Sequence, residues 1–271
     1  MSDWSVKRVE LTRGTATYLE SGERSAEHTL VLLHAFPVGM HMWEAQRIPV
    51  DWHAIAPAMP GFDGAAGADP QSGNIDDYAR WALDLMDHLD VATAVVGGLS
   101  MGGYVTFALW RLAASRCRAL VLADTKAGAD TEQARTARQK ALELVAREGV
   151  SGLANDMLPK LLGETTRAGR PEVVGYVRAL IERQTPSAVA GALRRLRDRP
   201  DATPLLPQID VPTLVLVGSE DTLTPPSESE RMRVVLPYAT LDIIEQAGHL
   251  SNLERPAAFD AALSAFLTTL P

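Results

Sequence analysis

The feature that most restricts the fold of this chain is the alternation of short apolar runs with segments of helical periodicity. The runs are continuous at three places, TLVLLH at 29–34, TAVVGGL at 93–99 and RALVLAD at 118–124. Such runs are typical of strands that are buried on both faces of a parallel sheet. Segments with apolar residues at every third or fourth position occupy 74–90 and 101–115. The chain therefore begins as a doubly wound α/β protein.

Further strand-like segments extend this predicted sheet. They lie at 6–12, 15–21, 53–59, 211–218 and 239–248. The first two, VKRVELT and TATYLES, suit an antiparallel edge. We expect an eight-stranded, mostly parallel sheet with helices on both faces, closed by helical segments at 227–236 and 256–269.

A helical insertion interrupts the sheet. The strand pattern stops after the first 125 residues, and four helical segments separated by Gly or Pro follow, at 131–149, 151–162, 171–184 and 186–199. The charge changes as well: residues 126–206 hold 14 Lys and Arg against 10 Asp and Glu, whereas the rest holds 12 against 24. We therefore predict one core domain, 1–125 with 207–271, and an insertion at 126–206.

Composition excludes several classes of protein. The formal net charge of −8 disfavours nonspecific binding to nucleic acid or to an anionic membrane. No segment reaches the 18 or so uncharged apolar residues that span a bilayer. The single cysteine, Cys117, excludes an internal disulfide and a cysteine-based metal cluster, and is expected to be a buried apolar residue. The first 14 residues lack the pattern of a secretory signal, so the expected location is the cytoplasm.

A serine stands where a buried strand is predicted to end and a helix to begin. The stretch VVGGLSMGGY contains the pattern G-x-S-x-G, with Gly98, Ser100 and Gly102 at its fixed positions. At the carboxyl edge of a parallel sheet, such a turn exposes the serine to the place where open α/β sheets bind ligands. Glycines on either side let the strand and the helix approach closely. Ser100 is therefore a candidate nucleophile, with a glycine-rich structural turn as the alternative.

A serine hydroxyl needs a base, and the base needs an acid to orient it. His249 follows the strand-like segment ATLDIIEQAG, and Asp221 follows the preceding one, VPTLVLVG. This is the chain order Ser, acid, His that goes with the G-x-S-x-G turn. We predict that Ser100, Asp221 and His249 act together. Asp124 at the end of RALVLAD is a rival acid, and otherwise caps a loop or a helix.

Two backbone N–H groups are candidates for stabilising a developing oxyanion. One belongs to Met101, which follows Ser100 at the start of a predicted helix, where the helix dipole also favours negative charge. The other belongs to Phe36, in the loop after TLVLLH, because the neighbouring Pro37 has no N–H to donate.

With these residues in view, the sequence resembles the α/β-hydrolase family. The motifs HAFP, MPGFDG, GLSMGG, GSEDTLTPP and AGHLSNLERP lie in family order over nearly the whole chain. GLSMGG, LVLADT and GHLSNLERP are most similar to 3-oxoadipate enol-lactonases and the small esterases and lactonases near them. The resemblance implies the roles given above for Ser100, Asp221, His249, Met101 and Phe36. It also implies that the insertion is a helical cap over the site.

One position departs from the family pattern. The family usually has His-Gly before the oxyanion residue, whereas this chain has His34 and Ala35. If that position requires a positive φ, Ala35 strains the loop, and if not, the change is harmless. The contribution of Phe36 depends on which of these holds.

Several other residues are candidates for binding the substrate or for holding the loops around it. His34, as an orienting residue of this loop, and His41 and Trp43, as pocket-lining residues, are the candidate substrate-binding positions. Ser251 and Asn252 are expected to hold the loop that carries His249. Four arginines near the end of the insertion are interpreted as a solvated helix face: Arg194, Arg195, Arg197 and Arg199.

The sequence thus predicts a serine hydrolase that cleaves a small carboxylic ester or lactone through an acyl-enzyme on Ser100. No metal or organic cofactor is expected, because the chain has no H-E-x-x-H, no paired cysteines and no G-x-G-x-x-G. The alternatives are a cofactor-free perhydrolase of the haloperoxidase type and a receptor that keeps the hydrolase fold. The expected partner is a small molecule, with no nucleic acid and no membrane, and a homo-oligomer is compatible with the sequence.

Overall fold

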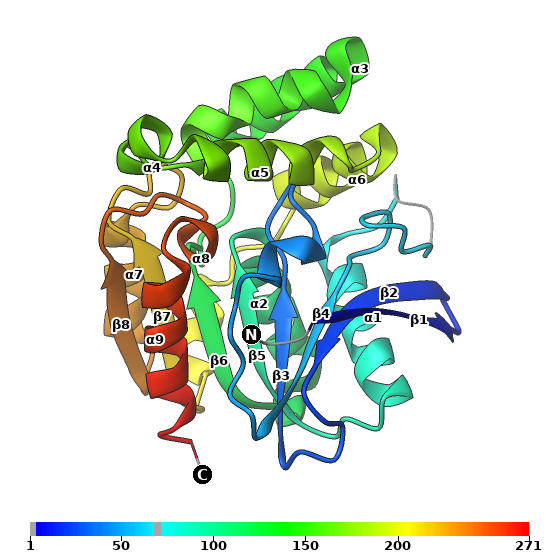
Figure 1. Ribbon diagram of the computed structural model, residues 1–271, viewed down its shortest axis with the longest axis vertical. Helices are drawn as coiled ribbons and strands as arrows, with labels where there is room; N and C mark the ends of the chain where they lie inside the picture. Colours follow the sequence, from blue (N-terminus) through cyan, green and yellow to red (C-terminus); the bar gives the residue numbers. More distant parts are fainter. Residues whose placement is uncertain (1–3, 68–71, 271) are drawn as a thin grey trace.

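The computed structural model describes residues 4–67 and 72–270 (Figure 1). Its strands are β1 (Ser5–Leu11), β2 (Gly14–Ser21), β3 (His28–Leu33), β4 (Trp52–Pro57), β5 (Ala94–Leu99), β6 (Cys117–Ala123), β7 (Thr213–Gly218) and β8 (Ala239–Ile244). Its α-helices are α1 (Ile75–His88), α2 (Met101–Ala113), α3 (Glu132–Leu161), α4 (Glu164–Gly169), α5 (Pro171–Glu182), α6 (Pro186–Arg197), α7 (Pro226–Val235), α8 (Ser251–Glu254) and α9 (Pro256–Leu267). Short 3₁₀ turns are η1 (Met40–Trp43), η2 (Ala114–Arg116) and η3 (Thr203–Gln208).

The eight strands form one sheet in the order β1-β2-β4-β3-β5-β6-β7-β8. β1 pairs antiparallel with β2, and β2 with β4, whereas every later pair is parallel. The predicted eight-stranded, mostly parallel sheet with an antiparallel edge is confirmed. The strand order reverses at β3, and an open sheet of this kind has its ligand crevice outside the carboxyl ends of such strands.

The central strands are buried along their whole length. Every residue of β5 and β7 is buried, whereas β1 at the edge is mostly exposed. Register places the strand ends side by side: Leu33 pairs with Gly98, and Leu99 with Ala123. The loops that follow β3, β5 and β6 therefore leave the sheet at the same edge.

Helices flank the sheet on both faces (Figure 1). α1 begins at an Asn74 capping box and buries Ile75, Tyr78, Trp81 and Leu85 along one side. α1 and α2 pack against each other behind the sheet, and α9 runs in front of it. This two-sided cover explains the continuous apolar sequences of the central strands.

The cap helices, α3 to α6, are stacked beyond the edge of the sheet to which the parallel strands point (Figure 1). They pack on one another, α3 against α5 and α6, and bury their own apolar residues, among them Leu153, Val177 and Leu193. The assignment of 126–206 as a separate cap domain stays a prediction.

The first two predicted helices of this region, 131–149 and 151–162, follow each other directly as the two halves of α3, and the break between them lies at Gly149 as the sequence indicates. α3 continues through Gly149, whose φ of 69° and ψ of −166° interrupt the helical backbone. A positive φ is accessible to glycine at little cost, so the chain bends there without a connecting loop. Pro159 lies further along the same helix.

Among the described residues, no helix combines the length and the apolar character that crossing a membrane requires.

Candidate active site

Ser100 lies on a sharp turn between β5 and α2. Its φ of 55° and ψ of −110° are unusual for a residue with a side chain. The turn is held from both sides: Ser100 N–H donates to the Ala123 carbonyl at 2.9 Å, and the Ser100 carbonyl accepts from Thr125 Oγ1 at 2.9 Å. A backbone strained by about 1–3 kcal/mol persists only where the surroundings hold it, and such residues are concentrated at functional sites.

The glycines around Ser100 are required by close packing. A Cβ on Gly98 would lie 2.1 Å from the Gly102 carbonyl, and a Cβ on Gly102 would lie 2.0 Å from the Leu33 carbonyl oxygen. Both contacts are with backbone, which cannot move aside. Strand β5, helix α2 and the end of β3 therefore meet only because neither position has a side chain.

His249 and Asp221 lie in line with Ser100. His249 Nε2 is 2.7 Å from Ser100 Oγ, and His249 Nδ1 is 2.8 Å from Asp221 Oδ2. His249 is in the histidine loop, 245–250, between β8 and α8, and Asp221 is in the acid loop, 219–225, after β7. Both side chains are buried. The structure thus brings together three residues that lie far apart in the sequence, as the predicted triad requires.

Thr224 belongs to the same hydrogen-bond network and was missed by the sequence reasoning. Its Oγ1 donates to Asp221 Oδ2 at 2.7 Å and lies 3.2 Å from His249 Nδ1. The N–H groups of Leu223 and Thr224 donate to Asp221 Oδ1 at 2.8 and 3.0 Å. The signal was present as an Asp followed three positions later by a Thr, a spacing typical of local side-chain turns.

The surroundings favour an ionised Asp221 beside a protonated His249. Burial raises the pKa of Asp221, but the charge and hydrogen bond of His249 and the donors from Thr224 more than offset it, so this pKa lies below its usual value. Burial likewise lowers the pKa of His249, and the neighbouring Asp221 more than offsets that, so the histidine pKa lies above its usual value. Such a pair can receive a proton on Nε2 and hold it.

The candidate oxyanion donors lie at the same edge of the sheet. Met101 is the first residue of α2, so its N–H has no acceptor within the helix. Phe36 lines the cavity above Ser100, and its N–H donates to none of the residues described here. Ala35 has no positive φ, so the departure from His-Gly places no strain on this loop.

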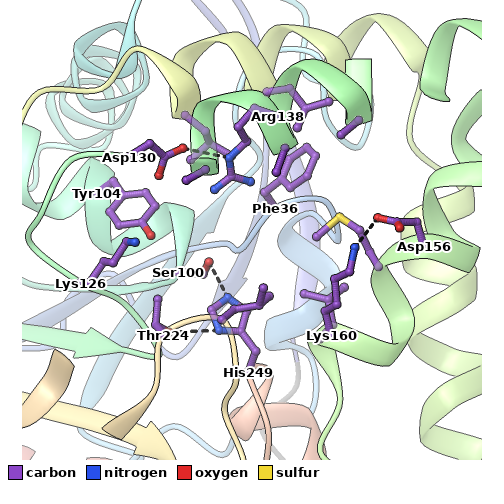
Figure 2. A pocket seen from close by; sticks show the side chains of 18 residues that line it. Phe36, Ser100, Tyr104, Lys126, Asp130, Arg138, Asp156, Lys160, Thr224 and His249 are labelled. Carbon is purple, nitrogen blue, oxygen red and sulfur yellow. Dashed lines mark hydrogen bonds and ion pairs between the residues drawn. The ribbon is translucent and has the colours of Figure 1, made fainter. Parts of the chain in front are cut away.

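A cavity of about 210 Å³ opens above Ser100 and His249 (Figure 2). Core and cap helices both contribute to its walls. The apolar part includes Phe36, Ala134, Ala137, Ala141, Met157, Leu161, Leu193, Leu196 and Leu223. The polar part includes Tyr104, Lys126, Asp130, Arg138, Asp156, Lys160 and Thr224.

The three predicted substrate-binding residues are absent from the described lining of this cavity, so that interpretation is corrected. His34 is fully buried, where Nδ1 bonds the Ala35 carbonyl and Nε2 accepts from Met59 N–H at 3.0 Å. His41 is bonded to Glu44 on η1, and Trp43 packs in the core against Phe259. His34 is thus bonded within the loop that carries Phe36, where it was expected to act as an orienting residue, whereas the partners of His41 and Trp43 lie outside the cavity lining.

Asp124 lies behind the candidate triad rather than in it. Its Oδ1 accepts from Gly218 N–H at 2.8 Å, and its Oδ2 accepts from Ser251 Oγ. Burial, first of all, raises its pKa well above the usual carboxyl range. Asp124 thus connects the ends of β6 and β7 to the first residue of α8, directly after the histidine loop. Asn252, also in α8, donates to the Met42 carbonyl at 2.9 Å and so ties this helix to η1.

The arginine run is not the solvated face that the sequence suggested. Arg195 and Arg199 are only 4% and 3% exposed. Arg195 lies over the Tyr78 ring, and Arg199 lies over the Tyr104 ring with its Nη1 on Asp130. A guanidinium can be buried when it stacks on an aromatic ring and forms an ion pair with a carboxylate, because these contacts offset the loss of water. Arg197, by contrast, pairs with Asp198 at the surface.

In the part of the chain that the structure describes, no group of three or more His, Cys, Asp or Glu side chains is placed to hold a metal ion.

Comparison with known proteins agrees with this geometry. A family model described as "alpha/beta hydrolase fold" matches residues 28–256. The chain is 27% identical over 240 residues to 3-oxoadipate enol-lactonase 2 of Acinetobacter baylyi, covering 88% of each chain. An esterase from Thermogutta terrifontis, solved with malate bound, superimposes with a TM-score of 0.91 at 34% identity, covering 97% of this chain and 98% of that one. The enol-lactonase of Burkholderia xenovorans gives 0.87 at 25% identity, covering 97% and 100%.

The family model spans most of the sequence, the predicted fold is confirmed, and esterases and enol-lactonases are among the similar proteins. The chain belongs to the α/β-hydrolase family.

Proposed function

We propose that this protein is a serine hydrolase that cleaves a small carboxylic ester or lactone through an acyl-enzyme on Ser100. One observation carries the proposal: Ser100, His249 and Asp221 form a continuous hydrogen-bonded chain at the floor of a cavity. Ser100 Oγ is 2.7 Å from His249 Nε2, and His249 Nδ1 is 2.8 Å from Asp221 Oδ2. A hydroxyl paired with a base that is itself oriented by a carboxylate is an activated nucleophile.

In the first half of the reaction, Ser100 Oγ forms a bond to the substrate carbonyl carbon while its proton passes to His249 Nε2. The carbonyl electron pair moves onto the oxygen, which the N–H groups of Phe36 and Met101 stabilise. Asp221 keeps the proton on Nδ1 and stabilises the imidazolium. When the carbonyl re-forms, the ester C–O bond breaks and His249 Nε2 returns its proton to the leaving alcohol oxygen.

In the second half, water attacks the acyl carbon as His249 Nε2 takes its proton. The tetrahedral species collapses, the bond to Ser100 Oγ breaks, and the serine regains a proton from His249. A lactone follows the same course, but the alcohol freed in the first step remains part of the acyl chain on Ser100, so hydrolysis of the acyl-enzyme releases a single hydroxy acid. The products are a carboxylic acid and an alcohol, or a hydroxy acid.

The size of the cavity supports a small substrate. An apolar cavity of about 150 Å³ binds benzene in a well-studied case. At about 210 Å³, this cavity suits an acyl group or lactone only somewhat larger. We also propose that residues 126–206 act as a cap, since the walls above Ser100 come from α3 and α6.

Labelling with a fluorophosphonate and hydrolysis of short acyl esters and lactones test this function. The wild-type protein should be labelled and active, and Ser100→Ala should lose all labelling and at least about 10³-fold in kcat. Ser219→Ala, in the acid loop, removes a hydroxyl that accepts from Gln246 N–H and is outside the cavity lining, and serves as a control that should keep both. A wild-type protein that is neither labelled nor active would instead be a receptor with the hydrolase fold.

A further inference from the structure

The cationic side chains that line the cavity above Ser100 differ in whether a carboxylate neutralises them. Lys126, Arg138 and Lys160 all line it, and so do the carboxylates of Asp130 and Asp156. Figure 2 shows Lys126 reaching in from one side and Lys160 standing on the opposite side. Lys160 is paired with Asp156 at 2.7 Å, so that side is neutral.

Lys126, in contrast, has neither an ion pair nor a hydrogen bond with the residues described here. It follows Thr125, whose hydroxyl holds the nucleophile turn, so its backbone is fixed beside the site. Its side chain is half-buried. An ammonium that is partly removed from water and has no counter-ion is a group that an anionic ligand can satisfy.

Two neighbours can join Lys126 in binding an anion: Arg138 adds positive charge, and Tyr104 adds a neutral hydrogen-bond donor. Arg138 donates only through Nε, to Asp130 at 3.2 Å, and the same carboxylate is shared with Arg199. One carboxylate faces two guanidinium groups, so a positive charge is left over. Tyr104 lies beneath Arg199, and burial, more than any other cause, raises the pKa of its hydroxyl, which therefore stays a hydrogen-bond donor.

We propose that Lys126, together with Tyr104 and Arg138, binds a free carboxylate of the substrate, so that the enzyme prefers esters or lactones of small dicarboxylic acids. Lys126, Tyr104 and Arg138 all line the cavity that contains Ser100, and in Figure 2 the guanidinium of Arg138 points toward Ser100 from above. Charge-assisted bonds from two cations and a phenol suit a carboxylate anion. The inference rests on the proposed hydrolase function and adds the class of substrate to it.

The test compares two substrates of the same shape. Monoethyl glutarate has a free carboxylate, and its primary-amide isostere has a neutral group in the same place. Ethanol release gives kcat/KM for each, and the ratio between them measures recognition of the charge. We expect the wild-type protein to prefer the carboxylate at least about tenfold, which corresponds to one charge-assisted contact.

Lys126→Met should reduce this ratio about tenfold, whereas Lys126→Arg should retain most of it because the charge remains. Lys140→Met is the matched control: it removes the same charge from an exposed position on α3 outside the cavity lining, and should keep the wild-type ratio. Fluorophosphonate labelling and the thermal midpoint show that each variant is folded.

The outcomes separate this inference from the proposed function. A wild-type ratio near one, or a folded Lys126→Met with the wild-type ratio, overturns the inference while hydrolysis of the amide ester leaves the proposed function intact. If neither ester is cleaved and the protein is not labelled, the proposed function itself fails. If the lysine variants do not fold, the wild-type ratio alone decides.

Discussion

At the scale of single residues, the candidate site depends on how Asp221 is held. Its carboxylate accepts two backbone N–H groups, the hydroxyl of Thr224 and the ring of His249. These donors stabilise the ionised form despite burial, and they fix the direction in which the carboxylate faces the imidazole. Thr224 is therefore a positioning residue for the reaction we propose.

Removing the Thr224 hydroxyl should weaken catalysis without removing the nucleophile. Thr224→Ala loses one bond to a charged acceptor, worth about 1–2 kcal/mol, so kcat should fall by about five- to thirtyfold. Because the Asp221 carboxylate, still ionised, is then a stronger acceptor for the imidazolium, the acidic limb of the pH–rate profile should move to higher pH. Thr224→Ser should restore both values. An unchanged pH profile in the alanine variant would contradict this role.

At the scale of secondary-structure elements, the histidine loop is bonded to the cap helices. His249 N–H donates to the Leu161 carbonyl at 3.1 Å, at the end of α3. Glu254, buried in α8, accepts from Gly163 N–H at 2.8 Å through one oxygen and from Gly248 N–H at 2.9 Å through the other. One carboxylate therefore connects the α3–α4 junction to the loop that carries the proposed base.

Glu254→Gln tests this connection. The amide has one NH₂ group where the carboxylate has an oxygen, so a donor faces a backbone N–H and a buried bond is lost. The free energy of unfolding should fall by about 1–3 kcal/mol, measured by urea denaturation. Glu230→Gln, exposed on α7, is the matched control and should change it by less than about 0.5 kcal/mol. Equal stability of the two variants would show that the bonds from Glu254 to Gly163 and Gly248 do not stabilise the fold.

At the scale of the whole molecule, pH acts in opposite directions on stability and on the proposed activity. The pKa of His249 is raised, so its contribution to stability is complete below 6.5 and is lost as pH rises through the folded-state value. Burial raises the pKa of Asp260 to about 6, and its contribution is likewise lost as pH rises. The lowered pKa values of Asp221 and Asp130 act at the other end, where stability is lost as pH falls below 3.8.

The free energy of unfolding should therefore be greatest near pH 4, above the range in which Asp221 and Asp130 are protonated, and should decline from there toward pH 8, first as Asp260 ionises and then as His249 loses its proton. The reaction needs a neutral His249, so kcat/KM should instead rise with pH, through an apparent pKa above 6.5. Thermal midpoints and initial rates measured across the same buffers check both trends. A protein that is most stable at pH 8, or a rate that levels off below pH 6, would contradict them.

Much of the architecture was predictable because it follows from local patterns. Continuous apolar runs predict the buried parallel strands, and all eight strands overlap segments that the sequence predicts to be strands. Gly98, Gly102 and the polar loops after β7 and β8 located Ser100, Asp221 and His249. These residues are recognisable because strand ends of a parallel sheet share one edge, whatever packs elsewhere.

The errors came where partners are distant in the sequence. His34 is held by Met59 N–H, and Trp43 packs on Phe259, so neither is available to a substrate. Arg195 and Arg199 look like surface charges in a polar run, but Tyr78 and Tyr104 on other helices cover them. Periodicity reports which face of a helix is apolar and carries no information about which ring or carboxylate will meet an arginine.

The chain's own residues decide that it folds as an α/β hydrolase with a serine at a strained turn, because hydrophobic period and turn chemistry are local properties. Which cations of the cavity remain unpaired is decided only by the tertiary structure. Lys126 and Lys160 are the same residue type in the sequence. Lys160 pairs with Asp156, whereas Lys126 lines the cavity without a partner in the described chain. An electrostatic interaction depends on distance and burial, and both are set when the cap helices pack over the sheet.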